Sequence, residues 1–277
     1  DMIGCFNEKC FQKYPENRSK FFQTLFSGCN PSDVVMTISE SGPVKVIEPS
    51  PPGKIIRLTD LNPSQPACYY LRNRKYDVEW LDKYWAVGYV ASVDRGHSPD
   101  CLNRLYIPMF YQQQLVGYQC RFIGDREWTA DCPKVRTMPH MKRGKYLYNL
   151  DTACRSRVMV LVEGPTSNWA VGFRGTGLWG NSISAQQVNL VNTYWGDDCL
   201  IVVMLDGSAM KESAKVTIKL QANCQAKVIS TQLRVSDDPG SLGEANSWQI
   251  IEETCKRNGV NLHDYLRGEN ASVAAVQ

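Results

Sequence analysis

The stretch "RVMVLVEGPTSNWAVG" at residues 157–172 decides the fold. It begins as a continuous apolar run and stops on Glu163-Gly164, just before a segment of helical character. A second stretch, "CLIVVMLDGSAMKESAKV" at residues 199–216, has the same pattern and stops on Asp206-Gly207. Continuous apolar runs are typical of strands that are covered by helices on both faces. We therefore predict two neighbouring strands of a parallel sheet.

The region after residue 157 alternates between the two kinds of element. Helix-prone "TSNWAVGF", in which Thr166 can cap, precedes a glycine-rich turn, "GTGLWG". The helix "SAQQVNLVNTYW" follows, with Ser184 as its N-cap. The strand of residues 199–205, a helix, the strand "AKVISTQL" and a last helix complete the region. This order predicts an α/β layer structure with right-handed crossovers.

The preceding residues have a different character. Residues 41–66 are rich in proline, serine and glycine and predict a linker with one short strand, Val44–Ile47. Two short helices are predicted next, from helical spacing in "ACYYLRNRKYDVEWLDKYWAVGY". The polar "YQQQ" between apolar runs at residues 104–123 predicts a β-hairpin. Up to about residue 150 we expect a mixed α+β subdomain.

Composition restricts the class of protein. The chain has 277 residues, of which 43% are hydrophobic and 21% charged, so a folded protein with room for two domains is expected. No apolar run has the length of a membrane helix, and no signal peptide opens the sequence. Eleven scattered cysteines favour a reducing cytosol over a disulfide framework. Cys5 and Cys10 provide only half of the four ligands of a zinc site.

Acidic residues follow three successive strands. Glu163 and Asp206 end the first two, and Asp237-Asp238 follow the third. Ligands of open α/β sheets bind beyond the carboxyl ends of the strands, and carboxylates gathered there favour Mg²⁺ with its phosphates. Glycine directly after an acid allows a sharp turn and leaves space above it. The alternative is that each acid is solvated or caps the next helix.

A group of basic residues, interleaved with tyrosine and tryptophan, lies upstream of these acids. Arginine and lysine can hold phosphates and position a nucleic-acid backbone. An ordinary solvated face is the alternative, and the net charge of +3 does not decide between them. The group consists of Arg72, Arg74, Arg104, Arg121, Lys134, Arg136, Lys142, Arg143 and Lys145.

A competing interpretation starts from "GTGLWG" at residues 175–180, which matches G-x-G-x-x-G, with Asp197 about twenty residues on. That pattern is typical of a dinucleotide site only when it follows a strand. Here it follows a helix-prone segment, so the match is weak.

Taken together, the motifs resemble a known family. "RVMVLVEGP", "LDG" and "DDP" resemble the TOPRIM fold, and their surroundings resemble bacterial and phage primases of the DnaG type. "CYYLRNRKYDVEWLDKYWAVGY" resembles the family's Tyr-Leu-x-x-Arg helix and the segment after it. "NRLYIPMFYQQQLVGYQCR" resembles its Arg-x-x-x-Pro strand and the hairpin that ends on arginine. "PKV", "RGKYLYNLDTA" and "WGNSISAQQ" resemble later motifs, and "GCFNEKC" is similar to the end of the family's zinc ribbon.

The resemblance implies an α/β TOPRIM fold, a parallel sheet with flanking helices, preceded by a mixed α+β primase subdomain. The implied boundaries are a zinc-ribbon remnant and helix at 1–40, a linker at 41–66, a basic α+β subdomain at 67–153, a TOPRIM subdomain at 154–260 and a tail at 261–277.

The implied activity is synthesis of RNA primers on single-stranded DNA from ribonucleoside triphosphates, giving an RNA/DNA hybrid in the cytoplasm of a bacterium or a phage-infected host. A replicative helicase is the implied partner, and no membrane is involved. Glu163, Asp206 and Asp238, with Asp237 in reserve, would hold Mg²⁺ or Mn²⁺ for an in-line displacement. Zn²⁺ would bind only if missing residues completed the Cys5 and Cys10 site. The implied residues for template or nucleotide are Arg74, Arg104, Arg121, Lys134, Arg143 and Lys145.

The sequence also departs from the family. The second acid of Asp-x-Asp is Ser208, and the second acid of Asp-Pro-Asp is Gly240. Each lost carboxylate weakens a metal site. The chain is therefore predicted to be a one-metal enzyme, an otherwise divergent enzyme, or a folded single-stranded-DNA-binding module with degraded chemistry. A TOPRIM nuclease or topoisomerase is a further alternative.

Overall fold

The computed structural model describes residues 48–124, 129 and 132–267. The chain divides into two compact units, residues 1–48 and 49–277, and nearly all described residues belong to the second. Cys5, Cys10 and the predicted strand Val44–Ile47 lie outside the described residues, as do residues 268–277 of the predicted tail.

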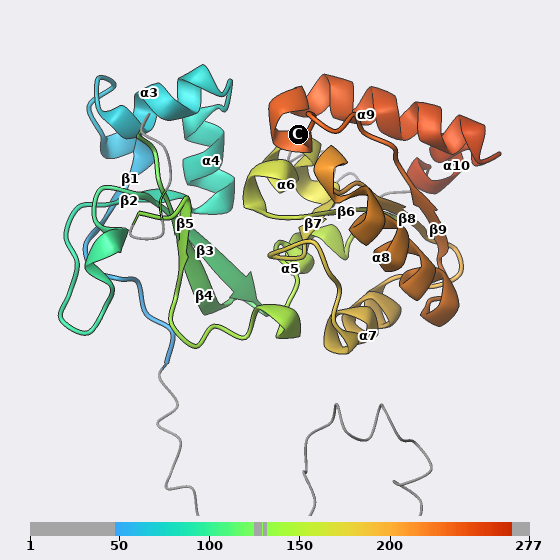
Figure 1. Cartoon of the computed structure of the whole chain (residues 1–277), viewed down its shortest axis with the longest axis horizontal. Helices are drawn as coiled ribbons and strands as arrows, with labels where there is room; N and C mark the ends of the chain where they lie inside the picture. The colour runs from blue at the N-terminus through green and yellow to red at the C-terminus, as the bar shows by residue number, and fades with distance from the viewer. Residues whose placement is uncertain (1–47, 125–128, 130–131, 268–277) are drawn as a thin grey trace, which may run out of the picture. The chain divides into compact units, whose positions relative to one another are not determined.

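The first half of the described unit is built on a five-stranded antiparallel sheet (Figure 1). Its strands, in spatial order, are β1 (Ile55–Arg57), β2 (Gly88–Val90), β3 (Leu105–Tyr111), β4 (Gln114–Arg121) and β5 (Val135–Thr137). The predicted hairpin is confirmed: Gln112 and Gln113 join β3 to β4, both with positive φ, as a two-residue type I′ turn requires. The carboxylate of Asp151 accepts hydrogen bonds from both of their backbone N–H groups.

The two predicted helices are α3 (Pro66–Asn73) and α4 (Val78–Trp85), and they share a core with this sheet. Leu71 and Leu81 pack in that core with Leu105 of β3, and all three are fully buried. Short elements complete this half, namely η1 (Leu58–Asp60), η2 (Pro99–Cys101), η3 (Arg143–Lys145) and α5 (Leu150–Ala153).

One expectation for this half was wrong. Residues 55–57, which the sequence placed in a linker, form β1 and pair with β2. The apolar pair Ile55-Ile56 is too short to stand out between prolines, but the edge of a sheet accepts it.

The second half is a four-stranded parallel sheet in the order β7-β6-β8-β9 (Figure 1). Its strands are β6 (Val158–Val162), β7 (Gly175–Gly177), β8 (Leu200–Val203) and β9 (Lys227–Ser230). All pairings in the sheet are parallel, as predicted. The sequence missed β7, because "GTG" has the composition of a turn. Since these residues are themselves a strand and do not open a helix, the dinucleotide fingerprint is also ruled out.

Helices cover both faces of the parallel sheet, which explains why β6 and β8 are entirely apolar. Met159 and Leu161 face a core shared with α7 and α8, whereas Val158, Val160 and Val162 face a core shared with α9 and α10. The helical elements are α6 (Pro165–Val171), η4 (Gly172–Arg174), α7 (Ala185–Tyr194), η5 (Gly207–Ala209), α8 (Met210–Asn223), α9 (Pro239–Arg257) and α10 (Leu262–Leu266).

The predicted cap of α7 is confirmed, since Ser184 forms a capping box with Gln187. The N-cap of α6 is Gly164 and not Thr166, because Pro165 occupies the first turn. In the described residues, no helix combines the length and the apolar character that a membrane crossing requires.

Tyr76 links the two halves beside the ends of the parallel strands. Its hydroxyl donates to the carbonyl oxygens of Thr166 at 3.0 Å and Gly240 at 3.3 Å, and its ring meets Trp169 edge-on. Tyr148 provides a further link, because it pairs with Gly177 of β7 and is buried in the core under α3 and α4. The loop between α3 and α4 is therefore fixed against the first turns of α6 and α9.

Candidate functional site

Two of the predicted acids meet at the carboxyl end of the parallel sheet. Glu163 directly follows β6, and Asp206 comes three residues after the end of β8. Because β6 and β8 are adjacent and parallel, their ends deliver both residues to one edge. The backbone N–H of Asp206 donates to Oε1 of Glu163 at 3.3 Å. The predicted convergence of these two residues is thus present in the structure.

The pKa values of both carboxyl groups are raised. Burial and the neighbouring Asp206 raise the pKa of Glu163 to about 7, with smaller contributions from Asp238 and Glu212. Burial and Asp238 also raise the pKa of Asp206, while Lys134 and Ser167 oppose the rise. Oδ1 of Asp206 is buried and has no hydrogen-bond partner among the described residues. A buried carboxylate oxygen without a donor is costly unless a further group binds it.

Asp238 and Asp237 are placed differently. Asp238 is the N-cap of α9, and its Oδ1 accepts from the backbone N–H of Ser241 at 3.0 Å. Oδ1 of Asp237 accepts from the hydroxyl of Ser236. Capping, the alternative for strand-end acids, therefore describes Asp238, although this residue is close enough to raise the pKa of both Glu163 and Asp206.

The two glycines behind the acids have different roles. A Cβ on Gly207 would lie 1.7 Å from the backbone oxygen of Arg234, so this position tolerates only glycine. Its N–H donates to the carbonyl of Asp237 at 2.9 Å, which draws the loop after β9 over the end of β8. A Cβ on Gly164 would meet nothing within 4 Å, so the space beside this glycine is open.

Three of the predicted basic residues gather around Tyr70 on α3. Nε of Arg121 donates to the Tyr70 hydroxyl at 2.8 Å, and the guanidinium of Arg74 lies 5.9 Å from the Tyr70 ring centre. Burial lowers the pKa of Lys134, and repulsion by Arg121 and Arg74 lowers it further. We call Arg74, Arg121 and Lys134 the cation cluster.

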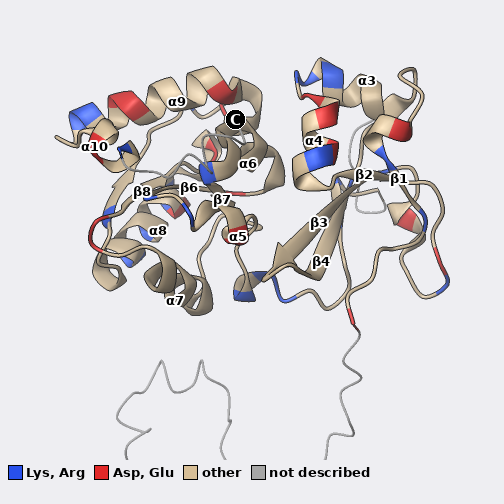
Figure 2. Ribbon diagram, turned by 180° about the vertical axis from the view of Figure 1, so that it is seen from behind, with Lys and Arg blue, Asp and Glu red and all other residues tan. Residues whose placement is uncertain are grey.

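The cation cluster is adjacent to the acids. Lys134 acts on the pKa of Asp206, and Asp238 acts on the pKa of both Arg74 and Lys134. Charges of both signs are otherwise dispersed along α4 and α9, in keeping with the small net charge (Figure 2). The antiparallel half therefore contributes cations, and the parallel half acids, to one site.

The other predicted basic residues lie elsewhere. Arg104 is only 3% exposed, and its guanidinium donates to the carbonyl of Pro133 at 2.7 Å. Its side chain holds the segment next to Lys134, and contact with nucleic acid stays a prediction for this residue. Arg143 and Lys145 are exposed on η3, which packs against α7. No contact between these two and the acids was found among the described residues.

Sequence reasoning missed three residues of the site, Tyr70, Tyr76 and Glu212. The sequence placed Tyr70 on a helix from its spacing and singled out neither Tyr76 nor Glu212. Only their tertiary neighbours distinguish them. The spacing of Glu212, six residues after Asp206 and in the first turn of α8, was the one available signal.

The carboxylates fit one divalent cation. No three histidine, cysteine, aspartate or glutamate side chains of the described residues are close enough to form a metal centre by themselves. Mg²⁺ usually takes one or two protein carboxylates and completes its shell with water and phosphate oxygens. Glu163 and Asp206 provide two, and Oδ1 of Asp206 is an oxygen that needs a partner.

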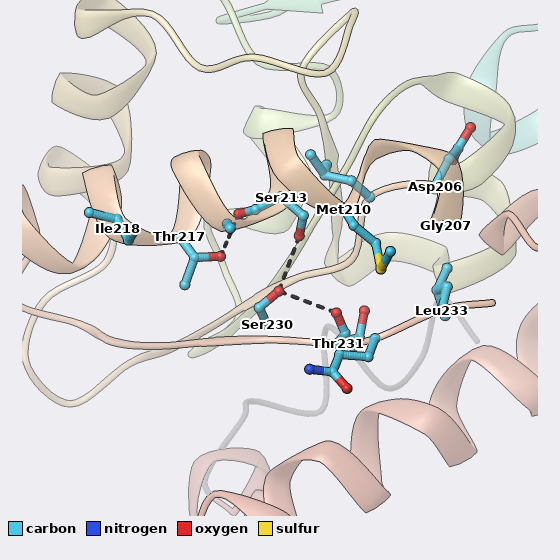
Figure 3. Close-up of a pocket in the computed structure, with 12 residues that line it drawn as sticks. Asp206, Gly207, Met210, Ser213, Thr217, Ile218, Ser230, Thr231 and Leu233 are labelled. Atoms are coloured by element: carbon cyan, nitrogen blue, oxygen red, sulfur yellow. Dashed lines mark hydrogen bonds between the residues drawn. The ribbon is translucent and has the colours of Figure 1, made fainter. Parts of the chain in front are cut away.

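A cleft lies on the far side of Asp206. It has a volume of about 380 Å³ and runs between α8 and the residues that follow β9 (Figure 3). Figure 3 shows the Asp206 carboxylate directed away from this cleft, whose floor carries the linked hydroxyls of Ser213 and Ser230. Asp206 is among the residues that line this cleft, whereas Glu163 is not.

Comparisons with known proteins identify the fold. No protein-family model and no curated protein matches the chain. Among solved structures, the zinc-binding and RNA polymerase domains of the Aquifex aeolicus primase align with a TM-score of 0.56 and 18% identity, over 77% of this chain and 66% of that one.

The RNA polymerase domain of Mycobacterium tuberculosis primase DnaG aligns with a TM-score of 0.56 and 16% identity, over 79% of this chain and 88% of that one. The same domain in complex with a double-stranded DNA oligomer with a 6-nucleotide overhang gives a TM-score of 0.56 and 18% identity, over 70% and 74%. The chain therefore has the fold of primase RNA polymerase domains.

Proposed function

We propose that this protein is a nucleotidyltransferase of the primase type, which synthesises RNA primers on single-stranded DNA. The observation that carries the proposal is the meeting of Glu163 and Asp206 with the cation cluster at the carboxyl end of the parallel sheet. The fold that the chain shares with primase RNA polymerase domains supports it. In this proposal the parallel half is a divergent TOPRIM subdomain of bacterial or phage origin.

Glu163 and Asp206 would hold Mg²⁺ or Mn²⁺, which when bound offsets the charge of the reacting phosphates. The half-buried position of the two carboxylates limits competition from water, so their attraction for a cation would be stronger than at a fully exposed surface. Asp238, whose oxygen is occupied by its own helix, contributes charge to the site in place of a direct bond. Asp237 would act only through water.

The cation cluster would hold the phosphates of the incoming ribonucleoside triphosphate or of the template. Arg74 and Arg121 can each present a planar donor group to phosphate oxygens, and Lys134 presents a compact charge. This arrangement supplies positioning and charge neutralisation, and it uses no protein nucleophile.

The proposed partners are single-stranded DNA, ribonucleoside triphosphates and the RNA/DNA hybrid that they form, with a replicative helicase in the cytoplasm. The related Mycobacterium tuberculosis domain in complex with an overhanging DNA supports the template. Arg143 and Lys145 are exposed and would extend the path of the template beyond the cation cluster.

The test is template-directed incorporation of labelled ribonucleotides with Mg²⁺ and, separately, Mn²⁺. We compare the unaltered protein with Glu163→Gln and Asp206→Asn, and use Asp197→Asn as the matched control. Asp197 is an exposed carboxylate that precedes β8, at the opposite edge of the same sheet. Both site variants should lose at least about a hundredfold in rate, because a bound cation supplies several kcal/mol.

Equal product from the unaltered protein and both site variants would refute the assignment. Cleavage of supercoiled plasmid without primer synthesis would indicate a nuclease or topoisomerase. Salt-sensitive binding of single strands with no incorporation would indicate a module that only binds DNA.

A further inference from the structure

Tyr70 lies at the centre of the cation cluster, and the proposed function assigns it no role. It is half-buried near the C-terminal end of α3, next to Leu71, which anchors the helix in the core. Its hydroxyl accepts a hydrogen bond from one arginine of the cluster, and its ring lies beneath the other. A single side chain therefore touches both arginines.

Arg121 needs such a partner because it is buried. The residue is 8% exposed at the end of β4, and its cationic neighbours are Arg74 and Lys134. A buried guanidinium is stable only when its donors are matched. Among the described residues, the side-chain hydrogen bond of Arg121 to Tyr70 uses Nε alone, which leaves the terminal nitrogens of the guanidinium for another acceptor.

Arg74 is held by the same tyrosine from another direction. Its guanidinium carbon lies 5.9 Å from the ring centre, within the range of a cation–π contact. Burial lowers the pKa of Arg74, but Tyr70, Tyr76 and Asp238 raise it by more, so the group stays charged. Three positive charges confined near one hydroxyl repel one another, and an anion would relieve that repulsion.

We propose that Tyr70 is a positioning residue that fixes Arg121 and Arg74 in the geometry needed to bind phosphate groups. The inference rests on the proposed function for its biological ligand, but its chemistry does not require catalysis. The phosphates would come from a nucleoside triphosphate beside Glu163 and Asp206, or from the backbone of a single strand. Both sources present the same oxygen acceptors to the two guanidinium groups.

The first experiment measures binding without metal. Inorganic tripolyphosphate, ATP and a short oligodeoxythymidylate are titrated in EDTA against the full chain and Tyr70→Phe. This variant keeps the ring under Arg74 and removes only the hydroxyl. Loss of a hydrogen bond that orients a charged donor should weaken binding about tenfold. Weaker binding of tripolyphosphate and ATP identifies a triphosphate as the ligand, and weaker binding of the oligonucleotide alone identifies the template; either result supports the role of Tyr70.

The matched control is Tyr89→Phe. The hydroxyl of Tyr89 lies 2.7 Å from Oδ1 of Asn103 in the same half of the protein. Its replacement also costs one hydrogen bond, and should leave phosphate binding unchanged. If primers are made, Tyr70→Phe should raise the KM for ribonucleotides about tenfold while kcat changes much less, a split that a general loss of stability does not produce.

A double-mutant cycle tests whether Tyr70 acts through Arg121. Arg121→Lys keeps the charge but cannot donate from Nε while also presenting a planar pair of donors. It should weaken tripolyphosphate binding about as much as Tyr70→Phe does, and the double variant should be little worse than either. Arg121→Lys also keeps the test decisive if Tyr70→Phe folds poorly, because it breaks the same bond from the other side.

Unchanged affinity in Tyr70→Phe for all three probes, multiplicative effects in the cycle, or an unaltered protein that binds none of the probes would each overturn the inference. A protein that shows the expected binding pattern but incorporates no ribonucleotides would refute the proposed function and leave the role of Tyr70 intact. Primer synthesis by the unaltered protein, together with unchanged phosphate binding by Tyr70→Phe, would refute the role of Tyr70 and leave the proposed function intact.

Discussion

Replacing Glu163 by glutamine should stabilise the metal-free protein at neutral and alkaline pH. The pKa of Glu163 is raised from its ordinary value of 4.5 to about 7, chiefly by burial and by Asp206. The folded protein therefore keeps this proton between about pH 4.5 and 7, while the unfolded chain releases it. Stability is fully present below this window and is lost as pH rises through it.

The size of the effect follows from the shift. At about 1.4 kcal/mol per pKa unit the upper bound is about 3 kcal/mol, and solvent screening of a half-buried group reduces it to about 1–2 kcal/mol. For a unit of this size, that corresponds to roughly 3–6 °C in Tm. Glutamine can still accept the hydrogen bond from the backbone of Asp206, so the geometry of the site is preserved.

The assay is thermal unfolding of the unaltered protein and Glu163→Gln at pH 5 and pH 8, in EDTA and in Mg²⁺. In EDTA the variant should be more stable at pH 8, and the difference should shrink at pH 5. Mg²⁺ at pH 8 should stabilise the unaltered protein and have little effect on the variant. Identical melting temperatures in EDTA at pH 8, or equal stabilisation of both proteins by Mg²⁺, would refute the reasoning. Asp197 is an exposed acid at the opposite edge of the sheet, so Asp197→Asn should have the same melting temperatures as the unaltered protein under all of these conditions.

Three further outcomes are expected from denaturant unfolding. Gly207→Ala should destabilise the protein by at least about 2 kcal/mol, because its Cβ would overlap a backbone oxygen, whereas Gly164→Ala, which meets nothing, should cost less than about 1 kcal/mol. Gly240→Asp, which places an acid where the resembled family has one, should destabilise by about 1–3 kcal/mol, since its Cβ would lie 2.9 Å from Oδ1 of Asp238 and 3.1 Å from the Tyr76 hydroxyl. Asp82→Asn should cost about 1–3 kcal/mol, because Asp82 is 7% exposed and binds Arg57 at 2.8 Å. Burial opposes ionisation of Asp82, but hydrogen bonds from Arg57 and Thr59 lower its pKa overall. The contribution of Asp82 to the free energy of unfolding should therefore disappear as pH falls through the acid range. If the difference in stability between Asp82→Asn and the unaltered protein stayed the same at acid pH, this assignment would be contradicted.

The sequence could predict those features that follow from the spacing of apolar residues and from the order of the elements along the chain. Apolar runs predicted β6 and β8, and because parallel strands end at the same edge, the meeting of Glu163 and Asp206 followed. The strand β7 could not be predicted, because three residues of glycine and threonine carry no period, and only pairing with β6 makes them a strand.

Side chains that act through neighbours could not be predicted either. Arg104 and Arg121 look alike in sequence, since the first directly precedes β3 and the second ends β4 of the same hairpin. The first binds a carbonyl oxygen of its own chain, and the second binds a tyrosine hydroxyl and keeps donors to spare. The two arginines differ in the acceptor beside each of them, and that acceptor is set by packing.

The number of acids at the site and the charge of the cation cluster should be considered together, because both determine the net charge that a bound phosphate meets. At Gly240, where the resembled family has an acid, a Cβ would lie 2.9 Å from Oδ1 of Asp238 and 3.1 Å from the Tyr76 hydroxyl, so packing leaves little room for a further carboxylate. In the proposed function, Glu163 and Asp206 would balance one divalent cation, and the three side chains of the cation cluster would meet the charge of a triphosphate. A site of this kind should depend on its arginines more than on a second metal ion, and restoring an acid at Gly240 should weaken phosphate binding as well as the fold. Tighter tripolyphosphate binding by Gly240→Asp would contradict this balance of charges.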